Sequence, residues 1–175
     1  MIANRRDGTN LSLDPVPEVA PCTERRARAR AAPQPFDMLR AHAFIRGENT
    51  LAVICDRPFD EVGTRLEASI AAHHLLLLQV HDIDALLHAA GIALGHRSRV
   101  YEVCNPEFAA QLLALDPGLA HTFPCRIAMH DHGGVVTVST PMPTVSVVEF
   151  SHAAPVARVA RLLEANLQRV LRGIQ

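Results

Sequence analysis

Histidine is the side chain best suited to take part in chemistry in this sequence, which holds 10 His but only one Tyr and no Trp. Imidazole nitrogen ligates transition metals and haem iron. His121 precedes a segment predicted as a buried strand, residues 126–130, and His130 ends it. Arg126 lies four residues before His130, so both side chains should point to the same side of that strand. The spacing would give a flat anionic cofactor such as haem an axial ligand and a guanidinium for a propionate.

The neighbouring predicted strand adds Arg99 as a second candidate propionate partner and Tyr101 as a further cofactor contact. A simpler interpretation stays open, in which His130 flanks a hairpin turn and His121 hydrogen-bonds backbone at a helix end. His130 and His132 also form a pair of imidazoles on one strand face, as in a surface metal site. Since no third ligand is identifiable in the sequence, a solvated hairpin tip is favoured over that metal site.

Four cysteines, at positions 22, 55, 104 and 125, have no zinc-finger spacing, so we expect no structural zinc site. Cys104 precedes a predicted helix, whose N-terminal dipole can lower a thiol pKa, and Cys104 and Cys125 are therefore candidates for thiol redox chemistry or sulfur transfer. The alternative is that both are small hydrophobic side chains packed at strand ends. The sequence lacks the common hydrolase, P-loop and dinucleotide motifs, which favours a binding protein over an enzyme.

The composition excludes several classes of protein. The 175 residues, 49% of them hydrophobic, suffice for one domain with a real core. A net charge of −1 argues against nucleic-acid binding. No apolar run reaches the length of a membrane span, and no secretory leader is recognisable, so we expect a cytoplasmic protein with reduced thiols and no membrane partner.

Residues 1–40 differ in composition from the rest of the chain. They hold five of the 12 prolines and the arginine-rich run Glu24–Ala31. We predict a disordered Arg/Pro/Ala-rich N-terminal arm. An arginine arm for an acidic partner is the disfavoured alternative, because four arginines without aromatic neighbours are a weak footprint. Residues 41–175 are then predicted to form a single domain.

Hydrophobic periodicity in that domain predicts an α+β fold. Strands are expected near 51–55, 75–80, 100–103, 126–130 and 135–140, and helices near 59–73, 83–90, 106–115 and from Pro155 onward. The strand at 75–80 is apolar throughout and should be covered on both faces. The order predicts one mostly antiparallel sheet with its helices on one face. The residues expected on the free face are Leu75, Leu77, Tyr101, Ala128, Val135 and Thr137. Such a face usually serves as a dimer interface or a ligand floor.

Cys104-Asn105-Pro106, followed some twenty residues later by Pro124-Cys125, resembles a bacterial subgroup of the family called domain of unknown function 302. A helix that starts at Phe59, a short Asp-led helix that ends in Gly, and a Gly-rich hairpin followed by Pro occur in the family's order. The resemblance covers roughly residues 48–143 and, more loosely, the last helix. It implies a TATA-binding-protein-like β-α-β(n)-α fold, usually as a homodimer, and haem binding has been associated with some members. DNA binding does not follow from the fold.

The sequence departs from the family pattern in two ways: His73-His74 stands where a Gly is usual at the helix end, and His121 and His130 stand where an apolar residue and an aromatic are more usual. Three hypotheses follow. The first is a non-enzymatic haem-binding homodimer with His121 or His130 as the axial ligand and Arg99 and Arg126 as propionate partners. The second is a thiol redox or sulfur-carrier protein. The third is a structural, partner-binding dimer without a cofactor.

Overall fold

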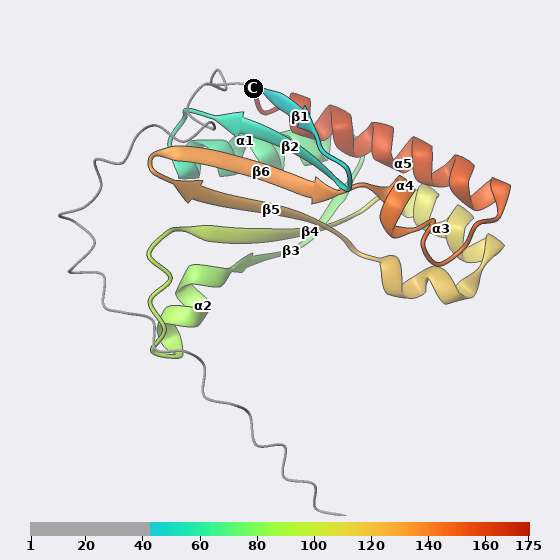
Figure 1. Ribbon diagram of the computed structural model, residues 1–175, viewed down its shortest axis with the longest axis horizontal. Helices are drawn as coiled ribbons and strands as arrows, with labels where there is room; N and C mark the ends of the chain where they lie inside the picture. The colour runs from blue at the N-terminus through green and yellow to red at the C-terminus, as the bar shows by residue number, and fades with distance from the viewer. Residues whose placement is uncertain (1–42) are drawn as a thin grey trace, which may run out of the picture. The chain divides into compact units, whose positions relative to one another are not determined.

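The computed structural model describes residues 43–175, which form one six-stranded antiparallel sheet with helices packed on it (Figure 1). The strands are β1 (Phe44–Arg46), β2 (Thr50–Cys55), β3 (Leu76–Asp82), β4 (Ser98–Cys104), β5 (Cys125–His132) and β6 (Val135–Pro141). The helices are α1 (Phe59–Ala72), α2 (Ile83–Ala89), α3 (Pro106–Leu115), the 3-10 helix η3 (Pro117–Thr122), α4 (Pro143–Ser146) and α5 (Ala154–Arg172). The predicted α+β class is confirmed. The predicted arm, residues 1–40, lies outside the described residues.

Local capping chemistry sets several of the predicted boundaries. The Asn105 side chain accepts hydrogen bonds from the amides of Glu107 and Phe108, at 3.1 and 3.2 Å, and so caps α3. Asp82 caps α2 by accepting from the Ala85 amide at 3.1 Å. These side chains satisfy amides that have no partner within the first helical turn, which is why both helices begin where the sequence predicts.

The strand order is β1-β2-β6-β5-β4-β3, and all neighbouring pairs are antiparallel. β6 returns from β5 through the predicted turn at Gly133 and Gly134, whose φ angles of 61° and 87° suit a tight hairpin. β1 and β3 form the two edges of the sheet. The sequence did not predict β1, because three residues are too few to show a period.

α1 and α5 cover one face of the sheet (Figure 1). α1 contacts β3 and β5, and α5 contacts β2 and β6. The sheet residues buried beneath them include Leu51, Val53, Tyr101, Val103, Ile127, Met129, Val136 and Val138. The predicted apolar stripe is buried as well: Val156, Val159, Leu163, Leu167 and Val170 on α5, and Ile174 just after the helix ends. Within residues 43–175, no helix is both apolar and long enough to cross a bilayer.

The other face of the sheet, called the open face from here on, differs in part from the prediction. Ala128, Val135 and Thr137 lie on it, since they alternate with buried neighbours along β5 and β6. The prediction was wrong for Tyr101, which is fully buried under the helices, and for Leu77, which pairs with buried Val103. The prediction was also wrong for Leu75, which is 4% exposed and belongs to the core. An irregular register between Leu77 and Gln79 breaks the simple alternation on which it rested.

The prediction that β3 is covered on both faces is also wrong. Leu76, Leu77 and Leu78 are 54%, 38% and 53% exposed. β3 lies at the edge of the sheet, and an apolar run in the sequence does not reveal whether its strand is central or at an edge.

Candidate functional site

Two of the predicted site residues share a strip of the open face. We define the open-face strip as His130, Ala128 and Arg126 on β5 with Val100 and Glu102 on β4. Ala128 pairs with Val100, and Arg126 pairs with Glu102. Directly opposed residues of an antiparallel pair point to the same face, so the strip runs from an imidazole over two small apolar side chains to a guanidinium.

A second imidazole, that of His96, lies near His130. The two ring centroids lie 6.5 Å apart, in an edge-on arrangement. Burial lowers the pKa of His130, and the charges of His96 and His132 lower it further. The lowered pKa favours the neutral ring, which is the form that ligates metals. His96 also lines, with His88, a pocket of about 410 Å³ beside α2.

Arg126 lies at the other end of the strip and is largely exposed. Its side chain is 68% exposed, and its Nε lies 3.7 Å from Glu102 Oε1. Glu102 is shared with the His81 ring, whose Nε2 lies 3.5 Å from the same oxygen. An exposed pair of this length is weak, so the Arg126 guanidinium can leave Glu102 for an anionic ligand at little cost.

His121 lies apart from this strip. It belongs to η3, which precedes β5, and its exposed ring packs edge-on against Phe150 with the centroids 4.2 Å apart. The structure therefore does not bring the two candidate axial ligands to one strand face. In the described part of the chain, no three His, Cys, Asp or Glu side chains gather closely enough to hold a metal ion.

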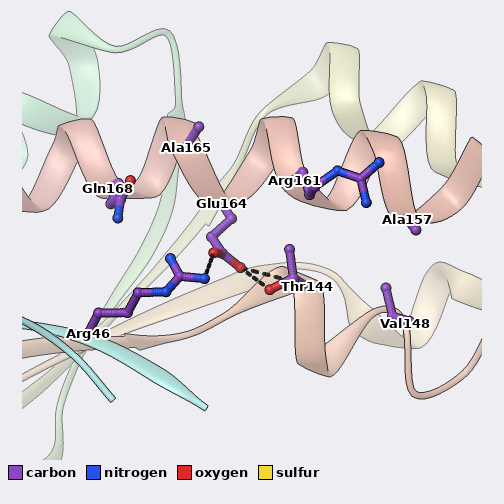
Figure 2. Close-up of a pocket in the computed structure, with 8 residues that line it drawn as sticks. All are labelled: Arg46, Thr144, Val148, Ala157, Arg161, Glu164, Ala165 and Gln168. Carbon is purple, nitrogen blue, oxygen red and sulfur yellow. Dashed lines mark hydrogen bonds and ion pairs between the residues drawn. The ribbon is translucent and has the colours of Figure 1, made fainter. Parts of the chain in front are cut away.

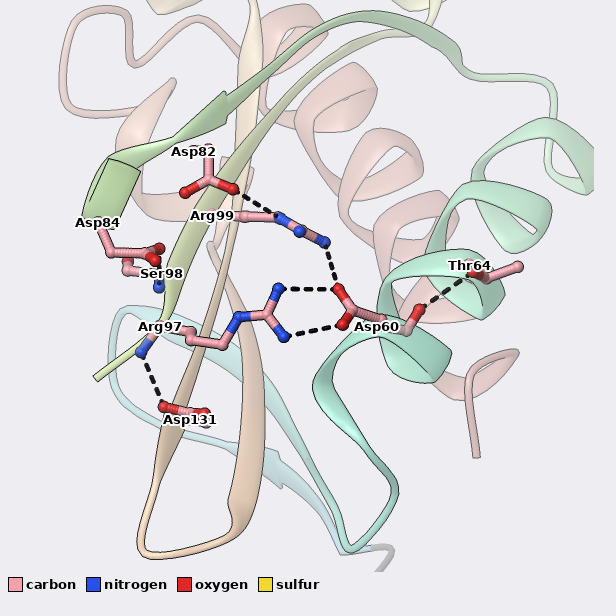
Figure 3. A network of polar contacts seen from close by, with 8 residues as sticks. All are labelled: Asp60, Thr64, Asp82, Asp84, Arg97, Ser98, Arg99 and Asp131. Carbon is pink, nitrogen blue, oxygen red and sulfur yellow. Dashed lines mark hydrogen bonds and ion pairs between the residues drawn. The ribbon is translucent and has the colours of Figure 1, made fainter. Parts of the chain in front are cut away.

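Arg99 lies on the covered side of β4, in a polar network that we call the Asp60 cluster: Asp60, Asp82, Arg97 and Arg99 (Figure 3). Arg97 donates two hydrogen bonds to the Asp60 carboxylate, at 2.8 and 2.9 Å. Arg99 lies 3.2 Å from Asp60 and 3.3 Å from Asp82. The expectation that Arg99 serves a ligand on the free face is not supported, because two carboxylates on the other side of the strand already hold it.

The Asp60 cluster joins the start of α1 to β4 and α2. The hydrogen bonds from Arg97 lower the pKa of Asp60, and the Ala85 amide, followed by Arg99, lowers that of Asp82. Arg97 also stacks on the Phe59 ring, with 4.3 Å between the guanidinium carbon and the centroid. The positive and negative groups of the Asp60 cluster are thus paired with one another, which is typical of an ion-pair network with a structural role.

Tyr101 lies beneath this cluster with its hydroxyl against Gly63. A Cβ at Gly63 would be 3.0 Å from the Tyr101 hydroxyl and 3.4 Å from Met129 Cε. Within residues 43–175 the hydroxyl has no hydrogen-bond partner, and burial raises the pKa of Tyr101. Tyr101 therefore cannot contact a cofactor on the open face; it fills the core under α1.

Cys104 and Cys125 lie at adjacent strand ends. Cys125 pairs with Val103 and so faces the covered side, whereas the next residue, Cys104, faces the other side. Both are free thiols. Burial raises both pKa values, and with the nearby charge of Cys104 it raises that of Cys125 to about 12. Raised values favour packed thiols over nucleophiles.

Sequence reasoning missed a groove between β1, α4 and α5, which we call the Glu164 groove (Figure 2). Its volume is about 530 Å³, and its lining residues are Arg46, Thr144, Val148, Ala157, Arg161, Glu164, Ala165 and Gln168. Glu164 Oε1 lies 2.7 Å from Arg46 Nη2, while its Oε2 accepts from the Thr144 amide at 3.1 Å and from the Thr144 hydroxyl.

Glu164 is a buried acid, 5% exposed. Burial raises its pKa, but the hydrogen bonds from Thr144 and Arg46 outweigh that effect, and the pKa is lowered overall. One signal in the sequence could have revealed it: Glu164 follows Val156 by eight residues, which is the spacing of one helix face. An acid at such a position needs partners from other elements, and the sequence does not show which.

These features define an α+β domain whose polar groups are mostly paired within the fold. The chain belongs to the family described as domain of unknown function DUF302, whose model matches residues 51–174. This agrees with the resemblance seen in the sequence.

A solved structure is similar in fold: an uncharacterized conserved protein DUF302 from Bacillus stearothermophilus. It matches with a TM-score of 0.69 and 22% identity, over 74% of this chain and 100% of that one. At this identity the likeness establishes the fold alone. No curated protein matches the chain.

Proposed function

We propose that this chain is a non-enzymatic binding protein that acts as a homodimer and holds a flat anionic cofactor, with haem as the leading candidate, on its open-face strip. His130 would be the axial ligand and Arg126 the propionate partner. The observation that carries the proposal is the shared face of these two residues with small apolar side chains between them.

The donor set of the strip suits haem. A neutral imidazole ligates haem iron, and haem adds electron-transfer or diatomic-ligand chemistry to the protein that binds it. The exposed guanidinium of Arg126, once it leaves Glu102, can pair with a carboxylate in bidentate fashion. Ala128 and Val100 offer a flat floor, since neither side chain rises far above the sheet.

We place the dimer contact of this proposal at the edge strand β3. Three consecutive leucines are exposed there, and an exposed apolar edge strand readily pairs with another chain. Pairing of β3 with its copy would bury Leu76 and Leu78 and leave both open faces accessible.

An absorption titration with ferric haem tests the ligand. We expect a Soret band that saturates at one haem per chain. His130→Ala should shift that band and weaken binding by about tenfold or more. Arg126→Ala should weaken binding less. It removes the partner of one propionate, which water can replace, and it leaves the bond between His130 and the iron in place.

His121→Ala is the matched control, since it removes an imidazole that lies off the sheet. It should leave the spectrum unchanged. A spectrum that His130→Ala leaves unaltered, or the absence of any Soret band, would reject the haem proposal.

The cofactor-free structural dimer is a second candidate, favoured by the exposed leucines of β3 alone. Light scattering on the purified chain tests it. Leu76→Lys combined with Leu78→Lys should convert a dimer into a monomer of unchanged helix content. If the dimer persists in this variant, the β3 contact is wrong; if it dissociates while haem never binds, the cofactor-free candidate stands.

A further inference from the structure

The Glu164 groove holds a positive charge that no acid neutralises. Three charged side chains line it: Arg46, Arg161 and Glu164. Thr144 and Arg46 occupy both oxygens of Glu164. Arg161 is exposed and has no carboxylate partner among residues 43–175. One guanidinium at the groove is therefore in excess, in contrast to the paired arginines of the Asp60 cluster.

The floor of the groove is small and apolar. Ala157 and Ala165 lie on the α5 side and Val148 lies after α4, on the opposite side (Figure 2). Their short side chains leave a volume of about 530 Å³, which is in the range of small-molecule sites. The Gln168 amide lines the same groove and can both donate and accept a hydrogen bond.

We propose that the Glu164 groove binds a small monocarboxylic acid with a short apolar body. The carboxylate pairs with the guanidinium of Arg161, and the body packs over Ala157 and Val148. A guanidinium matches a carboxylate through two parallel N–H donors, and the pairing is strengthened where one side of it is shielded from water.

The charge of the groove selects a monoanion. With Arg46 and Arg161 positive and Glu164 negative, one added negative charge brings the lining to neutrality. A second negative charge on the ligand would meet the Glu164 carboxylate, which hydrogen bonds keep ionised. Dicarboxylates and phosphate should therefore bind more weakly than a monocarboxylate of the same size.

Backbone amide NMR on the full chain tests this inference, with hexanoate as the probe. We expect saturable shifts confined to residues that line the groove, with a dissociation constant on the order of 1 mM. Hexan-1-ol has the same apolar body without the charge, and inorganic phosphate has charge without the body. Both should bind at least several-fold more weakly.

A pair of variants on one helix gives the decisive comparison. Arg161→Gln should weaken hexanoate binding about tenfold, which corresponds to one charge-assisted pair. Arg158→Gln is the matched control, because Arg158 is one turn earlier and lines a different groove, between α3 and α5. It should bind hexanoate like the wild type.

Three results would overturn the inference: equal binding by Arg161→Gln, equal binding of hexan-1-ol, or shifts confined to the α3–α5 groove. Arg161 is exposed and does not belong to the buried core, so Arg161→Gln should fold. A normal amide spectrum of that variant without hexanoate verifies this directly.

Discussion

Asp60 and Glu164 are both carboxylates that join separate elements of the fold, but their surroundings are opposite. The Asp60 side chain is 66% exposed and lies among Arg97, Arg99 and Asp82, where acids and guanidiniums pair with each other. The Glu164 side chain is 6% exposed and lies in a groove where Arg161 is left over.

The comparison distinguishes the Asp60 cluster, a structural ion-pair network, from the Glu164 groove, a candidate binding site. Water screens the exposed pairs of the Asp60 cluster, so each contributes little to stability. Glu164 is buried whereas its partner Arg46 is 50% exposed, so the cost of removing the acid comes mainly from the Thr144 amide and hydroxyl, which lose their acceptor in a partly buried place, at about 1–3 kcal/mol. The region with the larger stability cost is therefore also the one that retains unpaired charge for a ligand.

The largest effect should come from Glu164→Ala. It leaves the Thr144 amide and hydroxyl without their acceptor, whereas the half-exposed Arg46 regains water, and we expect a loss of about 2 kcal/mol in the free energy of unfolding. Urea denaturation at an unchanged m-value measures it. Glu149→Ala removes an exposed acid and should change stability by less than about 0.5 kcal/mol. Equal losses in the two variants would break the comparison.

Gly63→Ala probes the packing under the Asp60 cluster. The new methyl group would press on the Tyr101 hydroxyl, and we expect a net loss of about 1 kcal/mol after the gain in helix propensity. Adding Tyr101→Phe should restore most of that loss, because it removes both the crowded atom and a buried hydroxyl without a partner. If the double variant is no more stable than Gly63→Ala, the crowding lies elsewhere.

Acid should weaken both regions, with the stronger pH dependence in the groove. The folded chain holds the pKa values of Glu164, Asp60 and Asp82 below their ordinary ones. Above the ordinary carboxyl range of about 4 this stabilisation is fully present, and it is lost as the pH falls through the lowered values. Urea midpoints between about pH 6 and pH 3 measure it. Glu164→Gln should flatten the profile more than Asp60→Asn does; the reverse order would contradict the burial argument.

The smallest effect should come from Asp60→Asn at neutral pH. Arg97 keeps one hydrogen bond to the amide oxygen and its stacking on Phe59, so the urea midpoint should fall only slightly. The wild type should approach the variant in 1 M salt, which screens exposed charges. A large fall in the urea midpoint that persists in high salt would mean that Asp60 behaves like the buried acid Glu164.

Much of the architecture could be predicted because its signals are local. The Asn105 and Asp82 caps, the Gly133-Gly134 turn and the apolar stripe of α5 each depend on neighbouring residues, and all four are as expected. Of the proposed site residues, the shared face of Arg126 and His130 was also predictable, since alternation along one strand fixes it.

The predictions that failed depended on contacts between distant segments of the chain. The sequence determined that this chain forms an α+β domain of its family, where its helices begin, and that Arg126 and His130 share a side of one strand. Only the tertiary structure decided that Tyr101 and Arg99 face the helices, that β3 is an edge, and that Glu164 meets Arg46 and Thr144. The physical reason is that side-chain period is a property of one segment, whereas the face that is covered and the charge that is left unpaired depend on which segments pack together.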